Sequence, residues 1–213
     1  MFNVCPRCGA YADDKPVDPV GPFVVCPACQ HRQPFSWLPL LIVSGASGTG
    51  KSAICLHLPA ALPECVAMET DILWGKVAAT PDDNYRGYRN AWLRIAKNIG
   101  QGGRPVVLCG TAEPDQIEPC PERRYFTAVH YLAVVCDDDV LVERLRQRPG
   151  QRANTAEFID RMRGYNRWFK EHAASTSPAM TLLDTSHRPL GASVEQTVRW
   201  VRGHLPSSGA AEG

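Results

Sequence analysis

A glycine-rich segment that follows a short apolar run limits the possible folds of this chain more than any other feature. The apolar run Leu40–Val43 leads into residues 45–52, which read Gly-Ala-Ser-Gly-Thr-Gly-Lys-Ser and match the pattern G-x-x-x-x-G-K-[ST]. In such a strand–loop–helix unit, backbone N–H groups converge on phosphate oxygens and the helix dipole adds a favourable field. The sequence therefore predicts a phosphate-binding loop between a buried strand and a helix.

The residues of this loop have distinct expected contacts with a nucleotide. We expect the Lys51 ammonium to reach the β- and γ-phosphates and the Ser52 hydroxyl to coordinate Mg²⁺. Together with the backbone contacts, the expected nucleotide-binding residues are Gly45, Ser47, Gly48, Thr49, Gly50, Lys51 and Ser52. Pro59 arrives about two turns into the following helix, so we expect that helix to end or kink there.

Short apolar runs alternate with longer helical patterns from residue 37 onward, as in strand–helix–strand units with a parallel sheet. Apolar side chains at spacings of three and four predict helices over 84–99 and 155–173, and a capping box at Ser193 and Gln196 precedes a predicted last helix. Five runs are predicted to be buried strands: Leu38–Ser44, Cys65–Met68, Pro105–Cys109, His130–Cys136 and Met180–Leu183. The predicted fold class is α/β, with a doubly wound, parallel, five-stranded sheet.

Two C-x-x-C pairs near the start of the chain form a second motif. Cys5 and Cys8 are separated from Cys26 and Cys29 by 17 residues, a spacing typical of four-cysteine zinc sites. We predict a zinc ribbon over 1–36, whose metal supplies much of its folding energy because so short a segment buries little apolar surface. Two disulfides, four unligated thiols or an iron site are the alternatives.

The other five cysteines are expected to be unpaired. Cys65, Cys109 and Cys136 lie in predicted buried strands, Cys55 on a helix and Cys120 in a loop. An odd total of nine cysteines, with no visible secretory signal, argues against a disulfide framework and for a reducing, cytoplasmic location. No apolar run is long enough for a membrane span.

Charge and composition narrow the choice of partners. The chain has 23 Lys plus Arg against 22 Asp plus Glu, and its apolar fraction of 44% is normal for a folded protein. This balance, and a ribbon with as many acidic as basic residues, argue against nucleic acid as a partner. A structural or protein-contact role is expected for the ribbon, and residues 206–213 are expected to be a disordered tail.

Residues 38–205 resemble the small P-loop kinases, on the strength of the phosphate loop at 45–52 and the features that follow. This group includes nucleoside, nucleotide, shikimate and gluconate kinases and chloramphenicol phosphotransferase. The resemblance implies a domain over 37–205 that binds ATP and Mg²⁺. It also implies a carboxylate after the second strand that takes the proton of the acceptor hydroxyl; Asp71 is the expected residue and Glu69 the reserve. A helix cap without chemistry is the alternative for this segment.

The resemblance also implies an arginine-rich lid at about 144–170. Residues 143–170 contain eight Arg or Lys and three Asp or Glu, so positive charge is concentrated there. Arg148 and Arg152 flank a possible hinge and are expected to stabilise charge on the transferring phosphoryl group, with Arg144 as a further nucleotide contact. Some of the other basic residues are expected to form an ordinary solvated helix face. By the same resemblance, the loop at 183–186 is expected near the adenine base or, equally, to be a plain turn.

One departure from the family pattern concerns the third strand. It ends in Cys109, Gly110 and Thr111 rather than in an Asp for the Mg²⁺ shell, so the second protein contact to the metal stays unassigned, with Glu113 or Asp115 as indirect candidates. The acceptor pocket is expected near Trp74, Tyr85, Arg86, Tyr88 and Arg89, although Tyr88 and Trp92 also fit a buried helix stripe.

These features predict an ATP- and Mg²⁺-dependent phosphotransferase that acts on a small molecule, with a nucleoside, nucleotide or sugar-like alcohol as the expected acceptor. The alternative is a regulatory P-loop NTPase whose zinc ribbon recruits a protein or nucleic acid. The sequence does not identify the acceptor.

Overall fold

The computed structural model describes residues 2–77, 84–148 and 155–206. At its centre is a parallel five-stranded sheet with the order β4-β5-β3-β6-β7. The strands are β3 (Leu40–Ser44), β4 (Val66–Glu69), β5 (Val106–Cys109), β6 (Val129–Val135) and β7 (Thr181–Asp184). The predicted α/β class and five-stranded parallel sheet are confirmed.

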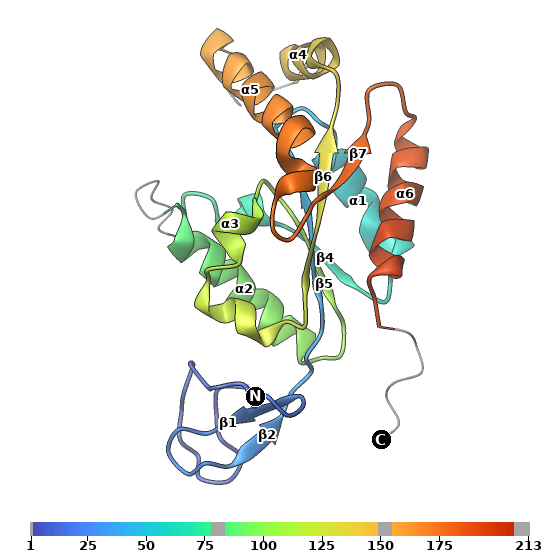
Figure 1. The fold of residues 1–213 in the computed structure, drawn as a ribbon. Helices are drawn as coiled ribbons and strands as arrows, with labels where there is room; N and C mark the ends of the chain where they lie inside the picture. The colour runs from blue at the N-terminus through green and yellow to red at the C-terminus, as the bar shows by residue number, and fades with distance from the viewer. Residues whose placement is uncertain (1, 78–83, 149–154, 207–213) are drawn as a thin grey trace.

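Helices cover both faces of this sheet (Figure 1), which explains why β3 and β5 are buried at every position. The helices are α1 (Lys51–Ala61), α2 (Arg86–Gly100), α3 (Pro114–Ile117), α4 (Asp138–Arg146), α5 (Ala156–His172) and α6 (Leu190–Gly203). Three short 3-10 helices join them: η1 (Thr70–Leu73), η3 (Pro121–Tyr125) and η4 (Ala173–Ser175).

Alternation along β3 divides the core into two halves. Leu40 and Ile42 face a cluster that contains Trp92 of α2 and Phe169 of α5. Leu41 and Val43 face the opposite cluster, which contains residues of α1 and α6. Because both halves anchor β3, the loop that follows it is held at the carboxyl edge of the sheet.

Two local predictions about helices were wrong. Pro59 lies inside α1, which continues to Ala61, because a proline in the last turn removes one hydrogen bond but leaves few residues to be displaced. The last helix begins at Leu190, so Ser193 lies inside it and donates a hydrogen bond to the Pro189 carbonyl instead of capping.

The N-terminal segment folds as a small module beside α2, at the bottom of Figure 1. Strands β1 (Phe23–Val25) and β2 (Arg32–Pro34) form an antiparallel hairpin. Its apolar core consists of Phe2, Val24 and Phe35 together with Tyr125, a residue of η3. We call residues 2–36 the ribbon module.

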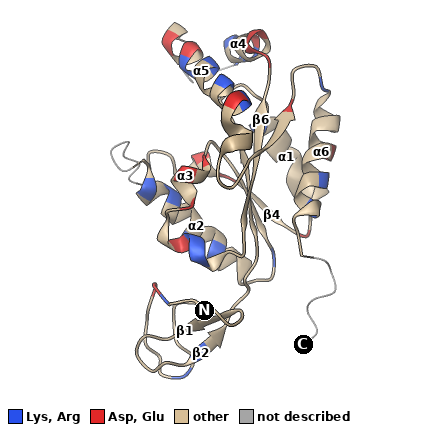
Figure 2. Ribbon diagram, viewed as in Figure 1, with Lys and Arg blue, Asp and Glu red and all other residues tan. Residues whose placement is uncertain are grey.

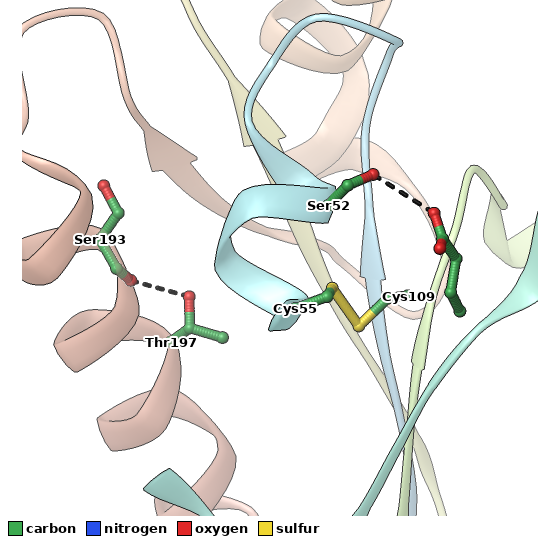
Figure 3. Close-up of a disulfide and its surroundings, with 6 residues drawn as sticks. Ser52, Cys55, Cys109, Ser193 and Thr197 are labelled. Carbon is green, nitrogen blue, oxygen red and sulfur yellow. Dashed lines mark hydrogen bonds between the residues drawn. A yellow bond between two sulfur atoms is a disulfide. The ribbon is translucent and has the colours of Figure 1, made fainter. Parts of the chain in front are cut away.

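The expectation that all five remaining cysteines are unpaired was wrong. Cys55 of α1 and Cys109 of β5 form a disulfide across a sequence separation of 54 residues (Figure 3). The sheet brings α1 over the end of β5, an arrangement that the positions of the two cysteines in the sequence do not reveal. Cys65, Cys120 and Cys136 are buried and unpaired, as expected.

None of the described helices combines the length and apolar character that a membrane span requires.

Candidate functional site

The phosphate loop lies between the end of β3 and the start of α1. Gly45 has φ 137°, and a Cβ at that position would lie 2.2 Å from the carbonyl oxygen of Val134 in β6. Only glycine therefore lets the loop turn so close to the neighbouring strand. Gly50 precedes α1 in the left-handed region at φ 99°, which directs the first N–H groups of the helix toward the loop.

Lys51 folds back over this loop, with its Nζ donating a hydrogen bond to the Ala46 carbonyl at 2.7 Å. Removal from water lowers the pKa of Lys51 to about 8, opposed by the negative charge of Asp71 and reinforced by the positive charge of Arg148. The ammonium is therefore held in a poorly solvated position next to both an acid and a second cation. A bound phosphate would restore its full charge.

Ser52 and Glu69 come together from different elements. The Ser52 Oγ donates a hydrogen bond to Glu69 Oε1 at 3.3 Å, as the dashed line beside Ser52 in Figure 3 shows. A hydroxyl and a carboxylate at this separation are the oxygen donors that Mg²⁺ prefers. Glu69 is therefore a candidate for the metal contact that the third strand lacks, whereas the sequence suggested it only as the reserve for Asp71.

The segment after β4 lies beside the end of β5. Glu69 is in register with Cys109, and a Cβ at Gly110 would collide with the Thr70 side chain at 1.7 Å. The absence of a side chain at position 110 therefore lets Thr70 pack against the end of β5. Asp71, the next residue in η1, is exposed and faces the same space.

These groups surround one cavity of about 250 Å³ at the carboxyl edge of the sheet. Its walls include the phosphate loop, the end of β4, the end of β5 and two arginines. The lining residues are Ser47, Gly48, Gly50, Lys51, Ser52, Ala53, Glu69, Asp71, Cys109, Gly110, Thr111, Arg144 and Arg148.

Arg144 links the phosphate loop to the end of β7. Its guanidinium donates to Oγ1 and to the carbonyl of Thr185, at 3.0 and 2.9 Å, and the Thr185 hydroxyl donates to the Thr49 carbonyl at 2.8 Å. Thr185 is buried and lies 136 residues from Thr49. The strand end that was expected near the adenine base thus also fixes the phosphate loop.

Three basic residues of the predicted lid are engaged by acidic side chains. Arg163 and Arg167 of α5 contact Asp138, at 3.8 and 2.5 Å, and Lys170 contacts Asp137 at 3.3 Å. Figure 2 shows basic and acidic positions mixed along the ribbons of α4 and α5. Arg148 lines the cavity, whereas Arg152 and the expected hinge at 149–150 lie outside the described residues.

The helix expected to border the acceptor pocket contributes mainly core residues, and no described residue of α2 lines the cavity. Tyr88 and Trp92 are buried in the core, so they belong to the buried stripe of the helix and not to the lining of an acceptor pocket. Arg89 is buried, its Nη2 donates to Gln116 Oε1 at 2.9 Å, and its Nε has no hydrogen-bond partner among the described residues. Trp74 is 55% exposed and packs at 5.7 Å from the Tyr85 ring, next to the segment that carries Asp71.

Glu113 does not line the cavity. It accepts a hydrogen bond from Tyr165, caps the short helix α3, and burial raises the pKa of its carboxyl. Arg123 and Arg124 pair with Glu118 and Asp14 respectively, so both belong to surface ion pairs.

The four N-terminal cysteines have the geometry of a metal site. All four Sγ atoms lie within 4.8 Å of one another, with Cys5–Cys29 at 3.7 Å and Cys8–Cys26 at 3.8 Å. Four thiolates at about 2.3 Å from one tetrahedral zinc would stand roughly 3.8 Å apart, so the cluster fits this ion. Burial would raise the pKa of Cys5, but backbone N–H groups of Cys8 and Arg7 contribute to lowering it to about 6, which favours the thiolate.

The basic residues of the ribbon module are poorly placed for phosphate contacts. Lys15 is fully buried and Arg32 pairs with Asp18 at 2.7 Å, so Arg7 is the remaining exposed cation of residues 2–36. Few cations of the module are therefore free to contact phosphate groups.

No protein-family model matches this sequence, and no curated protein matches it either. Solved structures do match. A sugar kinase from a Janibacter species aligns with TM-score 0.56 and 15% identity over 78% of this chain and 95% of that one. The fold is that of a P-loop kinase. A putative kinase from Chloroflexus aurantiacus (TM-score 0.52, 18% identity, 80% and 100% coverage) and a shikimate kinase from Bacteroides thetaiotaomicron (0.51, 16%, 78% and 98%) share it. At these identities the similarity concerns the fold alone.

Proposed function

We propose that this protein transfers the γ-phosphate of ATP to a hydroxyl group of a small molecule in a Mg²⁺-dependent reaction. The observation that carries the proposal is the convergence of Lys51, Ser52, Glu69 and Asp71 on one cavity at the carboxyl edge of the sheet. Phosphoryl transfer to an alcohol requires groups that bind the phosphates, oxygen ligands for the metal and a carboxylate that accepts the proton of the hydroxyl.

The chain's own residues would act as follows. Backbone N–H groups of the loop and the Lys51 ammonium hold the phosphates, and the Ser52 hydroxyl and Glu69 carboxylate would hold Mg²⁺, directly or through water. The ion, when bound, neutralises charge on the β- and γ-phosphates. Asp71 accepts the proton as the acceptor oxygen forms its bond to the γ-phosphorus and the bond to the ADP oxygen breaks.

The arginines around the cavity would stabilise the same transition state. Arg148 lines the cavity and its positive charge reaches Lys51, so it is placed to interact with charge that develops on the transferring group. Arg144 holds the loop through Thr185 and would contact the nucleotide from that side. Arg152 stays a catalytic candidate on sequence grounds alone.

We infer a nucleoside, nucleotide or sugar-like alcohol as the acceptor. The exposed Trp74 and its neighbour Tyr85 offer aromatic surface for a ring, and the buried Arg89 has a free N–H for an anionic or hydroxyl group. Kinases of sugars, gluconate and shikimate among the structural neighbours support an alcohol acceptor of this size. Zinc in the cluster of Cys5, Cys8, Cys26 and Cys29 completes the proposed cofactors.

The regulatory alternative is less favoured because the cavity places the Asp71 carboxylate beside the phosphate loop, and a nucleotide-dependent switch has no need of a group that accepts the proton of an acceptor hydroxyl. The ribbon module itself does not decide between the two, since Val4, Tyr11 and Val20 are exposed on it.

A coupled assay of ADP release over a panel of nucleosides, nucleotides and sugars tests the proposal. One acceptor should raise turnover well above the rate of hydrolysis by water, and Asp71→Asn should lower that turnover roughly 10²- to 10⁴-fold with little change in ATP affinity. The matched control is Asp160→Asn, at a side chain 83% exposed on α5. Acceptor-independent hydrolysis throughout, unaffected by Asp71→Asn, would refute the kinase proposal.

A further inference from the structure

The ribbon module packs against the rest of the protein through an aromatic contact with η3. Phe2 packs edge-on against Tyr125 with ring centroids 5.1 Å apart, and both side chains are buried. The Tyr125 hydroxyl donates a hydrogen bond to the Lys15 carbonyl at 2.8 Å. Lys15, in turn, donates through Nζ to the Phe2 carbonyl at 2.7 Å and to Gln33 at 2.8 Å. The contact therefore requires several separate segments of the module to be in place at once.

A layer of charge beneath this contact connects the module to α2. The Lys97 ammonium lies over the rings of Phe2 and Tyr125, at 4.5 and 4.6 Å, and 2.8 Å from the Glu122 carboxylate. Arg94 bridges Glu122 at 2.9 Å and Asp13 of the module at 3.2 Å. Because Lys97 and Glu122 are buried, loss of one partner would leave an uncompensated charge. Two residues of α2, Arg94 and Lys97, thus depend on the ribbon module for part of their contacts.

The C-terminal end of α2 has its own link to the module. The Gln101 side chain accepts a hydrogen bond from the Ser36 N–H at 3.0 Å and donates one to the Ser36 carbonyl at 3.3 Å. A side-chain amide that satisfies both backbone groups of one residue fixes that residue against the helix end.

The other half of α2 holds the segment that carries the candidate catalytic groups. The Tyr88 hydroxyl and the Trp92 Nε1 both donate to the Thr70 carbonyl, at 2.6 and 3.2 Å. Thr70 lies between Glu69 and Asp71. A helix of 15 residues spans about 22 Å and moves as a unit, so a shift at its ribbon end is transmitted to Thr70.

The module has few means of keeping its shape without a metal. Its regular structure is two strands of three residues each, and its apolar core is completed by a residue from outside. Phe2, which makes the central contact, is three residues from the cluster residue Cys5. Metal binding by four cysteines supplies the folding energy that so small a unit lacks.

We propose that the ribbon module is a positioning element for the active site: metal bound by Cys5, Cys8, Cys26 and Cys29 holds Phe2, Asp13 and Lys15 against α2, and α2 thereby holds Glu69–Asp71 in place. Tyr125, Lys97 and Glu122 are positioning residues in this scheme. The inference rests on the proposed zinc site, and its catalytic consequence rests on the proposed kinase function. Its structural part does not depend on any acceptor.

Amide hydrogen exchange of the full-length, zinc-loaded protein tests the structural part. Tyr125→Phe removes the hydroxyl that bonds the Lys15 carbonyl and leaves the cysteines untouched. We expect exchange in α2 (residues 86–100) to become roughly fivefold to tenfold faster with one zinc still bound, and exchange in α6 (residues 190–203) to be unchanged. Arg202→Gln is the matched control, because it cuts an exposed ion pair with Glu64 far along the chain from the module. Unchanged exchange in α2 of Tyr125→Phe would overturn the proposal.

Removal of zinc by a chelator gives the second measurement. Exchange should rise in residues 2–36 and in α2 before α6, and readdition of zinc should restore both. Equal loss of protection in α2 and α6 would show a general loss of stability and would overturn the specific coupling. If an acceptor is known, Tyr125→Phe should raise KM for that acceptor more than KM for ATP. Faster exchange in α2 with no kinase activity in any variant would leave the positioning role standing and reject the proposed function.

Discussion

Ser52, the second residue of α1, donates a hydrogen bond to Glu69, the last residue of β4, at 3.3 Å. Glu69 ends β4, whereas Ser52 lies at the start of the helix that follows β3, and β5 lies between β4 and β3 in the sheet; the two side chains nevertheless meet at its carboxyl edge. The Glu69 carboxylate therefore lies beside the Ser52 hydroxyl, which is expected to coordinate Mg²⁺. The third strand of the sheet in chain order, β5, has no acidic residue at its end that could take this place.

Glu69→Gln should weaken metal-dependent nucleotide binding. The amide keeps the shape of the side chain but removes the negative charge that would face Mg²⁺, so we expect Mg²⁺ affinity in the presence of ATP to fall about 10- to 100-fold. This affinity is measured by following nucleotide binding as the Mg²⁺ concentration is raised. Glu64→Gln, which removes a carboxylate paired with Arg202 on the surface, is the control and should have no effect on Mg²⁺. Equal affinities for both variants would show that Glu69 does not serve the metal.

Nucleotide affinity should decrease as the pH rises through about 8. Burial lowers the pKa of Lys51 to about 8, so the free protein loses this positive charge above that pH, while a bound phosphate favours the protonated form. The ATP dissociation constant should therefore rise by up to about tenfold per pH unit above pH 8 and vary little below it. Calorimetry across this range checks the slope. Lys51→Ala should bind ATP weakly at every pH, without the rise in dissociation constant above pH 8. A dissociation constant that does not change with pH in the unaltered protein would contradict a phosphate-binding role for Lys51.

Reduction of the Cys55–Cys109 disulfide should lower stability. The bridge closes a loop with a sequence separation of 54 residues, and chain entropy alone predicts a loss of about 4 kcal/mol when it is opened. Thermal unfolding with and without reductant measures the difference. The double variant Cys55→Ala/Cys109→Ala should be insensitive to reductant.

A thiol count provides an independent check of the same bond. In denatured, metal-free protein, seven of the nine cysteines should react before reduction and all nine after it. Nine reactive thiols in carefully oxidised protein would rule the bond out.

The N-terminal cluster should hold one zinc ion per chain. Four Sγ atoms within 4.8 Å fit a single tetrahedral ion, and Cys26→Ser should lose most of the bound metal because the alcohol is a poor ligand for zinc. Elemental analysis of the purified protein measures the content. Cys120→Ala, which changes a buried thiol outside the cluster, should retain one zinc. Iron in place of zinc, or no metal in either protein, would contradict the assignment.

Contiguous motifs were predictable because their geometry depends on neighbouring residues. The loop at 45–52 carries its own turn glycines and lies between an apolar strand and a helix, so its fold follows from local backbone conformation. Each C-x-x-C pair similarly presents two thiols from one turn. The apolar runs also predicted the five strands and their parallel class. The expectation that all five are buried holds for β3, β5 and β6, whereas β4 and β7 lie at the edges of the sheet and are largely half-buried or exposed.

These local patterns did not predict contacts between residues that are far apart in the sequence. Thr185 meets Thr49 across 136 residues because the parallel strands β3 and β7 end at the same edge of the sheet. Cys55 meets Cys109 across 54 residues because α1 packs against β5. Lys97 lies on the predicted helix over 84–99, yet its side chain is fully buried between Phe2 of the ribbon module and Glu122 and Tyr125.

The sequence alone therefore determined the phosphate loop, the four-cysteine cluster and the α/β class, all of which depend on short-range spacing and hydrophobic periodicity. Only the tertiary structure decided that Glu69 stands beside Ser52, that Arg163 and Arg167 are engaged by Asp138, and that the ribbon module packs on α2. The physical reason is that strand order, register and docking bring together side chains whose separation along the chain carries no information about their distance in space.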